Sequence, residues 1–128
     1  MATILIVEEE EPVRELVALV LQDGGHRTLQ AIHGGQALEL VAREHPDVVI
    51  SDIMMPVIGG AELCRRLKAK PKTRAIPVIL MSSAGRTAAD GTGSDAFLAK
   101  PFELDELEAV VRRWLPSEDS PPAHESTT

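Results

Sequence analysis

The sequence predicts an α/β protein in which helices cover both faces of a parallel sheet. Short apolar runs alternate along the chain with segments whose apolar residues recur at helical spacing. In order, these runs and segments are Ile4 to Val7, Val13 to Leu21, Thr28 to Ile32, Ala37 to Val41, Val48 to Ile50, Leu63 to Leu67, Val78 to Met81, Ala96 to Ala99 and Leu104 to Trp114. Continuously apolar strands are typical of sheets buried on both faces and built from right-handed βαβ crossovers.

Residues at the ends of the helical segments agree with this pattern. Pro12 suits the first turn of the first helix, where its missing amide has no intrahelical partner to lose. Gly24 and Gly25 can end the same helix. The last helix has an apolar face formed by Leu104, Leu107, Val110, Val111 and Trp114.

One stretch interrupts the alternation. From Ser82 to Ala96 there is no Leu, Ile, Val, Met or Phe, and Gly85, Gly91 and Gly93 all fall inside this stretch. A helix here would have no apolar face to bury and would lose stability at each glycine. We therefore expect a loop, or a shortened or disordered helix, where a fourth regular helix would otherwise stand.

Length and composition favour one domain. The chain has 128 residues, 44% of them hydrophobic, which suits one compact core and leaves little for a second. We expect residues 1–116 to form this domain. Residues 117–128 are rich in Pro, Ser, Thr and acidic side chains, so we expect them to be a disordered acidic tail.

Charge and cysteine content exclude several classes of function. The formal net charge is −7 and the pI about 5.0, so the protein should repel nucleic acid phosphates and anionic membranes. Its one cysteine, Cys64, cannot form an internal disulfide, and no basic start or long apolar stretch indicates export or membrane insertion. We expect a cytoplasmic protein that binds neither nucleic acid nor membrane.

Polar residues follow four of the predicted strands. The acidic run Glu8 to Glu11 follows the first strand, Asp52 the third, Ser82 the fourth and Lys100 the fifth. Open α/β sheets bind ligands at the carboxyl edge, where these strand ends meet. Carboxylates are hard ligands that suit Mg²⁺, and an ammonium group and a hydroxyl could hold a phosphoryl group while Asp52 attacks it. Taken alone, the acidic run also fits a solvated helix start.

Four segments together resemble the response-regulator receiver family, in its single-domain, chemotaxis-type form. They are Ile4 to Val7 followed by acids, Pro46 to Pro56 (PDVVISDIMMP), Ile76 to Ser82 (IPVILMS) and Gly93 to Phe102 (GSDAFLAKPF). The resemblance covers residues 3 to about 115. It implies a flavodoxin-like, doubly wound, five-stranded parallel sheet of order 2-1-3-4-5.

The resemblance also implies a Mg²⁺ site and an acceptor. Asp52 is expected to be the phosphoacceptor. Glu8 and Glu9 match the family's acidic pair, and Met54 is expected to offer its backbone carbonyl to the metal together with Asp52. The second acid is normally Asp, so the longer Glu9 must bend back or act through water to meet the strict geometry of Mg²⁺.

Further residues match the family's switch. Ser82 is expected to be the switch hydroxyl, Lys100 to bind the phosphoryl group, and Phe97 to be the switch aromatic. The Lys100-Pro101 bond resembles the family's cis peptide. Gly59 stands where the family often has Asp, and we expect it to loosen the loop after Asp52.

The implied function is a phosphoryl-accepting receiver module of a two-component system. Mg²⁺-dependent phosphorylation of Asp52 would shift a conformational equilibrium that controls partner binding. The protein would not be an enzyme in the usual sense, although it would assist its own phosphorylation and dephosphorylation. A histidine kinase or histidine phosphotransfer protein would donate the phosphoryl group, and the downstream protein target is not indicated.

Two alternatives stay open. A pseudo-receiver would act as a protein-binding adaptor without phosphorylation, which Glu9 and the interrupted stretch favour. A Mg²⁺-dependent aspartyl phosphohydrolase would need its nucleophile after the first strand, where only glutamates stand.

Overall fold

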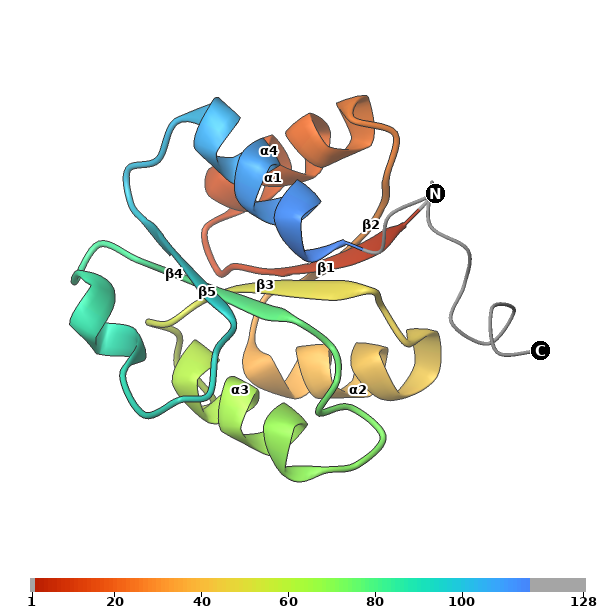
Figure 1. The fold of residues 1–128 in the computed structure, drawn as a ribbon, viewed down its shortest axis with the longest axis vertical. Helices are drawn as coiled ribbons and strands as arrows, with labels where there is room; N and C mark the ends of the chain where they lie inside the picture. The colour runs from red at the N-terminus through yellow and green to blue at the C-terminus, as the bar shows by residue number, and fades with distance from the viewer. Residues whose placement is uncertain (1, 116–128) are drawn as a thin grey trace.

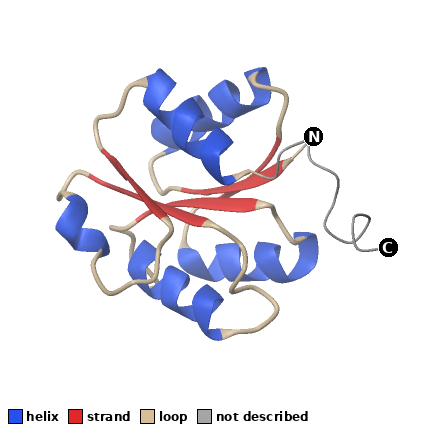
Figure 2. Ribbon diagram, in the orientation of Figure 1, coloured by secondary structure: helices blue, strands red, loops and turns tan. Residues whose placement is uncertain are grey.

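A computed structural model describes residues 2–115, which form a five-stranded parallel sheet between two layers of helices (Figures 1 and 2). The sheet has the order β2-β1-β3-β4-β5, and each neighbouring pair of strands is parallel. The strands are β1 (Thr3–Val7), β2 (Arg27–Ala31), β3 (Val48–Asp52), β4 (Val78–Ser82) and β5 (Ala96–Ala99). The predicted flavodoxin-like order is confirmed. The predicted tail, residues 117–128, lies outside the described residues.

The helices cover the sheet in pairs. The elements are α1 (Glu11–Asp23), α2 (Gly34–Glu44), α3 (Gly60–Ala69), the 3-10 helix η1 (Arg86–Ala89) and α4 (Leu104–Trp114). Helices α1 and α4 lie on one face, and α2 and α3 on the other (Figure 1). No helix within residues 2–115 has the length and apolar character needed to cross a bilayer.

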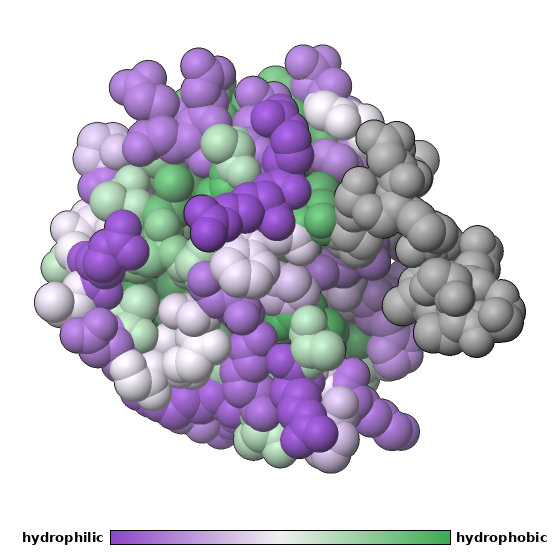
Figure 3. Space-filling model, in the orientation of Figure 1, coloured by the Kyte–Doolittle hydropathy of each residue, from purple (hydrophilic) through white to green (hydrophobic). Residues whose placement is uncertain are grey.

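Each face of the sheet has its own apolar core. Along β1, Ile4 and Ile6 contribute to the core under α1 and α4, whereas Leu5 and Val7 contribute to the core over α2 and α3. Successive strand residues point to opposite faces, so a strand buried on both sides must be apolar at every position. This explains the unbroken apolar runs of the sequence. In the view of Figure 3, hydrophilic side chains gather along the lower edge, where α3 and the loop after it lie.

The interrupted stretch contains only the single 3-10 turn η1, as its missing apolar face predicts. Gly85, Gly91 and Gly93 flank this turn with φ angles of 96°, 75° and 84°, which other residues rarely adopt. A polar link anchors the returning chain. The Asp95 carboxylate accepts the Lys68 ammonium at 2.7 Å and the Val78 amide at 2.8 Å, joining the start of β5 to α3 and β4.

Candidate phosphorylation site at the carboxyl edge of the sheet

The strand ends bring three of the predicted site residues into direct contact. Glu8 directly follows β1, Asp52 ends β3 and Lys100 directly follows β5. The Lys100 ammonium lies 2.7 Å from Glu8 Oε1 and 3.3 Å from Asp52 Oδ1. One cation therefore bridges two carboxylates that are far apart in the sequence. We call these three side chains the acidic cluster, because it carries one net negative charge when all three are ionised.

Burial makes the charges of the acidic cluster interact strongly. Glu8 is only 1% exposed and Asp52 only 7%. Burial raises the pKa of Asp52, the neighbouring charge of Glu8 raises it further, and Lys100 offsets part of this rise. Burial alone would lower the pKa of Lys100, but its hydrogen bond and charge contact with Glu8, together with Asp52, outweigh burial and raise it. Lys100 therefore stays protonated at neutral pH.

The loop between β1 and α1 is held by hydrogen bonds that orient Glu8. Glu8 Oε2 accepts the amide of Glu10 at 3.1 Å. The Arg14 guanidinium donates to the Glu8 carbonyl at 2.9 Å and to Gln30 Oε1 at 3.0 Å, which ties the loop to β2. No motif or pattern in the sequence marks Arg14 for this role. Its position one turn into α1, facing β2, was not visible without the register of the neighbouring strand.

The loop after Asp52 packs more tightly than expected. A Cβ atom at Gly59 would lie 2.7 Å from the Ile53 carbonyl oxygen, and one at Gly60 would collide with the carbonyl of Asp52 itself. Glycine at position 59 is thus required by the close approach of two backbone segments. Its small size allows the start of α3 to approach the backbone that follows β3.

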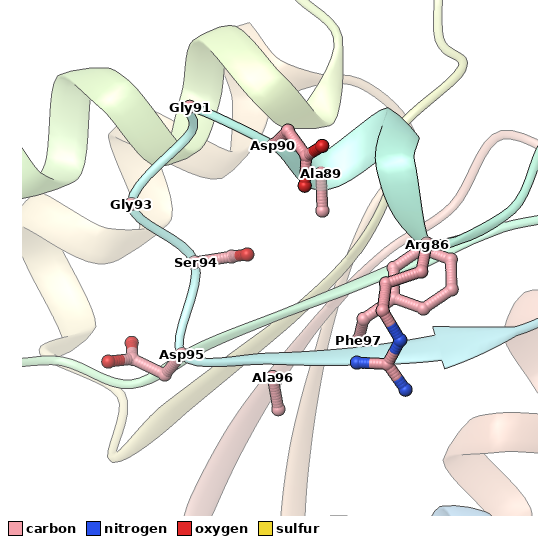
Figure 4. Close-up of a pocket in the computed structure, with 9 residues that line it drawn as sticks. All are labelled: Arg86, Ala89, Asp90, Gly91, Gly93, Ser94, Asp95, Ala96 and Phe97. Atoms are coloured by element: carbon pink, nitrogen blue, oxygen red, sulfur yellow. The ribbon is translucent and has the colours of Figure 1, made fainter.

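Ser82 and Phe97 lie on the two strands nearest η1. Ser82 is fully buried at the end of β4, and its hydroxyl oxygen accepts the Ala84 amide at 2.9 Å. Phe97 is half-buried on β5, and the Arg86 guanidinium lies over its ring, 5.7 Å from the centroid (Figure 4). Arg86 and Phe97 border a hollow of about 340 Å³ beside η1. Arg86 was also not singled out from the sequence, because its partner is set by the path of the short turn.

The other two expected metal ligands, Glu9 and Met54, are exposed. No described residue forms a hydrogen bond or ion pair with the Glu9 carboxylate. The Met54 carbonyl accepts no backbone hydrogen bond within residues 2–115. Among these residues no group of three or more His, Cys, Asp or Glu side chains converges to hold a metal. The Lys100-Pro101 peptide is cis, as the resemblance implied.

Fold and strand-end residues together define the class of protein. The family model for the response regulator receiver domain matches residues 4–112, and the chain belongs to this family. Receiver domains are the phosphoryl-accepting modules of two-component signal transduction, and this function holds for the chain. The family membership that the four sequence segments indicated is confirmed.

Individual relatives have different lengths. The phosphate regulon transcriptional regulatory protein PhoB of Pseudomonas aeruginosa is 36% identical over 94% of this chain and 56% of its own length. The chain therefore spans about half the length of this and similar relatives. Sporulation initiation phosphotransferase F of Bacillus subtilis is 35% identical over 88% of this chain and 93% of its own length. A receiver domain of the Pseudomonas aeruginosa sensor kinase PA1611, with magnesium coordinated in its active site cleft, superposes with a TM-score of 0.83 at 27% identity, covering 91% of this chain and 98% of that one.

Proposed function

We propose that Asp52 is the phosphoacceptor of this receiver domain. The observation that carries the proposal is the position of its carboxylate, at the carboxyl edge of the central strand and 3.3 Å from the Lys100 ammonium. An Asp52 oxygen attacks the phosphorus of the donor, forming an acyl phosphate bond, while the bond from phosphorus to the donor atom breaks. Lys100 then faces the new phosphoryl oxygens with a positive charge. By holding the reacting groups in this way, the protein assists its own phosphorylation and dephosphorylation.

The donor set of the acidic cluster fits Mg²⁺. The Glu8 and Asp52 carboxylates both contact one ammonium nitrogen, so they lie close enough to share a cation, and their like charges are only partly compensated. Mg²⁺ is commonly held by one or two carboxylates and retains several waters. Glu8, Asp52 and the Met54 carbonyl would hold the ion, and the exposed Glu9 would act through water. When bound, Mg²⁺ supplies charge neutralisation for the phosphoryl oxygens.

The predicted switch residues, Ser82 and Phe97, lie on β4 and β5, the two strands that follow β3 in the sheet order. Ser82 is adjacent to the acceptor strand, and its carbonyl accepts the Lys100 amide at 3.0 Å. We infer that phosphorylation draws the Ser82 hydroxyl towards the phosphoryl oxygens and alters the position of Phe97 on the neighbouring strand. Such a change would shift an equilibrium between two surfaces, one of which binds the downstream protein target.

The phosphoryl donor is expected to be a histidine kinase or a histidine phosphotransfer protein. Beside Lys100 lies a hollow of about 550 Å³ whose apolar lining includes Val13, Leu16 and Phe102. An apolar surface next to the acceptor would let a donor protein exclude water while its phosphohistidine reaches Asp52.

Intact mass spectrometry after incubation with acetyl phosphate and Mg²⁺ tests the acceptor. The wild-type protein should gain one phosphoryl group and Asp52→Asn none. Asp90→Asn, which removes an exposed aspartate near η1, is the matched control and should label like the wild type. Unchanged labelling of Asp52→Asn would refute the assignment. A wild-type protein that no donor labels would favour the pseudo-receiver instead.

The variant Glu9→Asp tests the proposed set of Mg²⁺ ligands. A shorter side chain at this position should bind Mg²⁺ more tightly, because Glu9 must give up conformational freedom to reach the ion. Titration of Mg²⁺ followed by amide NMR shifts measures both proteins. Equal or weaker affinity in the variant would show that the site is built around glutamate, or that residue 9 does not take part.

A further inference from the structure

Positive charge is concentrated in one short segment of this acidic protein. Residues 65–74 contain six of the 13 Lys and Arg residues and no Asp or Glu. The six are Arg65, Arg66, Lys68, Lys70, Lys72 and Arg74. Since the chain carries −7 and this segment +6, the other 118 residues carry −13. Such a separation of charge sets up a strong local field.

This segment lies at the opposite edge of the sheet from Asp52. Helix α3 starts at Gly60, against the backbone of Asp52, and runs away from it to Ala69. The loop from α3 to β4 then curves around the lower part of the molecule (Figure 1), where the surface is largely hydrophilic (Figure 3). The exposed end of this segment, after Ala69, is therefore separate from the phosphorylation site.

Hydrogen bonds hold the loop in one shape. The buried Thr73 hydroxyl donates to the Leu67 carbonyl at 2.6 Å, and the amides of Thr73 and Arg74 donate to the Lys70 carbonyl at 3.1 and 2.9 Å. The Lys68 ammonium adds bonds to the carbonyls of Arg74 at 3.2 Å and Ile76 at 2.9 Å. A loop ordered in this way loses little conformational freedom when it binds a partner.

Only three of the six cations pair with an acid among residues 2–115, and two of those three share one carboxylate. Arg65 and Arg66 share Glu62, at 3.6 and 3.0 Å, and the half-buried Lys68 pairs with Asp95. The remaining three cations are exposed and form no ion pair with any described residue: Lys70, Lys72 and Arg74. Stabilisation of the helix dipole explains basic residues in the last turn of α3, but Lys72 and Arg74 lie beyond the helix end.

We propose that the basic surface formed by Lys70, Lys72 and Arg74 binds a short acidic segment of a partner protein. A short ligand is favoured because the rest of the molecule is strongly negative and would repel a longer polyanion. A nucleic acid duplex or an anionic membrane extends beyond ten residues of protein surface and would meet the repulsion of the acidic remainder. A short run of Asp and Glu side chains gains the attraction without this repulsion. The field also steers such a partner towards this edge during encounter.

Amide NMR titration with a hexaglutamate peptide at low ionic strength tests the proposal on the full chain. The peptide should cause saturable shifts centred on residues 65–74. The variant Lys70→Gln/Lys72→Gln/Arg74→Gln should bind about tenfold more weakly, given the usual contribution of exposed ion pairs. The control Arg43→Gln/Arg112→Gln/Arg113→Gln removes the same charge from exposed positions elsewhere and should bind within about twofold of the wild type.

Three results would overturn the proposal. Equal weakening in the two triple variants would show attraction to net charge alone. Shifts centred outside residues 65–74 would show a different site. Tighter binding of a DNA duplex or of phosphatidylglycerol vesicles at the same residues would replace the acidic polypeptide with another ligand class. Both triple variants should keep the wild-type unfolding curve, because the substituted side chains are exposed.

Discussion

The acidic cluster and the basic surface are both groups of charges at loops along the edges of one sheet, yet water reaches only the second freely. Glu8 is 1% exposed and the Lys100 side chain 17%, whereas Lys70, Lys72 and Arg74 are all exposed. Charges removed from water interact strongly, shift pKa values and are costly when left unpaired. Exposed charges add little to stability but remain available to a partner. Burial, more than the number of charges, should therefore decide what each group does.

The largest expected effect is at Lys100. Lys100→Met keeps much of the side-chain volume but leaves Glu8 and Asp52 facing each other without the bridging ammonium. We expect the free energy of unfolding at neutral pH to fall by about 3 kcal/mol, as in other broken buried ion pairs. Urea denaturation measures this change. Lys70→Met is the matched control on the exposed basic surface, and a loss at Lys100 no larger than in this control would contradict the comparison.

Substitution of Lys68 tests whether burial or position in the sequence decides how much stability is lost with a charge. Lys68 belongs to the basic segment, but its ammonium points inward to Asp95 and to the carbonyls of Arg74 and Ile76. Lys68→Met should lower the free energy of unfolding by about 2 kcal/mol, because it leaves these acceptors without their donor. The control is Lys72→Met, at an exposed position of the basic surface, and it should change the free energy of unfolding far less. Similar losses in the two variants would show that position along the segment, rather than burial, sets the cost.

Asp52 should be the one buried site at which removing charge stabilises the protein. Its pKa is raised by burial and by Glu8, so its ionised form is less favourable in the folded than in the unfolded state. Asp52→Asn should therefore raise the free energy of unfolding at neutral pH, because the variant has no carboxylate to ionise in the folded state. Lys100 keeps Glu8 as its partner in this variant.

The pH dependence of this gain has a defined sign. Below the ordinary aspartate pKa of about 3.9, Asp52 is protonated in both states, so the wild type and Asp52→Asn should be equally stable. As the pH rises through the raised folded-state pKa, the wild type should lose stability relative to the variant, and the difference should then stay constant. Denaturation at a series of pH values measures it. A difference that grows as the pH falls would contradict the direction of the shift.

The smallest effect is expected at Lys72. Lys72→Gln should change the free energy of unfolding by less than about 0.5 kcal/mol at any salt concentration, because the side chain is exposed and has no described ion-pair partner. The same variant should still weaken binding of the acidic peptide. Thermal denaturation and the peptide titration, carried out on one sample, measure both properties. A clear loss of stability would mean that the basic surface supports the fold.

Much of the fold and the place of the site could be predicted from the sequence. The alternation of apolar runs and helical segments predicts a parallel sheet, and such a sheet brings the carboxyl ends of its strands to one edge. The meeting of Glu8, Asp52 and Lys100 follows from that rule. The absence of Leu, Ile, Val, Met and Phe between Ser82 and Ala96 likewise predicts the loss of a regular helix, because a helix without large apolar side chains has little to bury.

The tertiary structure alone decided which side chain faces which. Glu8 turns inward to Lys100 while Glu9 faces solvent, although the sequence treats the two glutamates alike. Gly59 allows a close approach of two backbone segments, and Lys68 points inward from a segment whose other cations are exposed. Sequence patterns report the period of an element, which sets its buried face. They do not report the path of a loop or the distance between two backbones, and these depend on contacts between residues far apart in the chain.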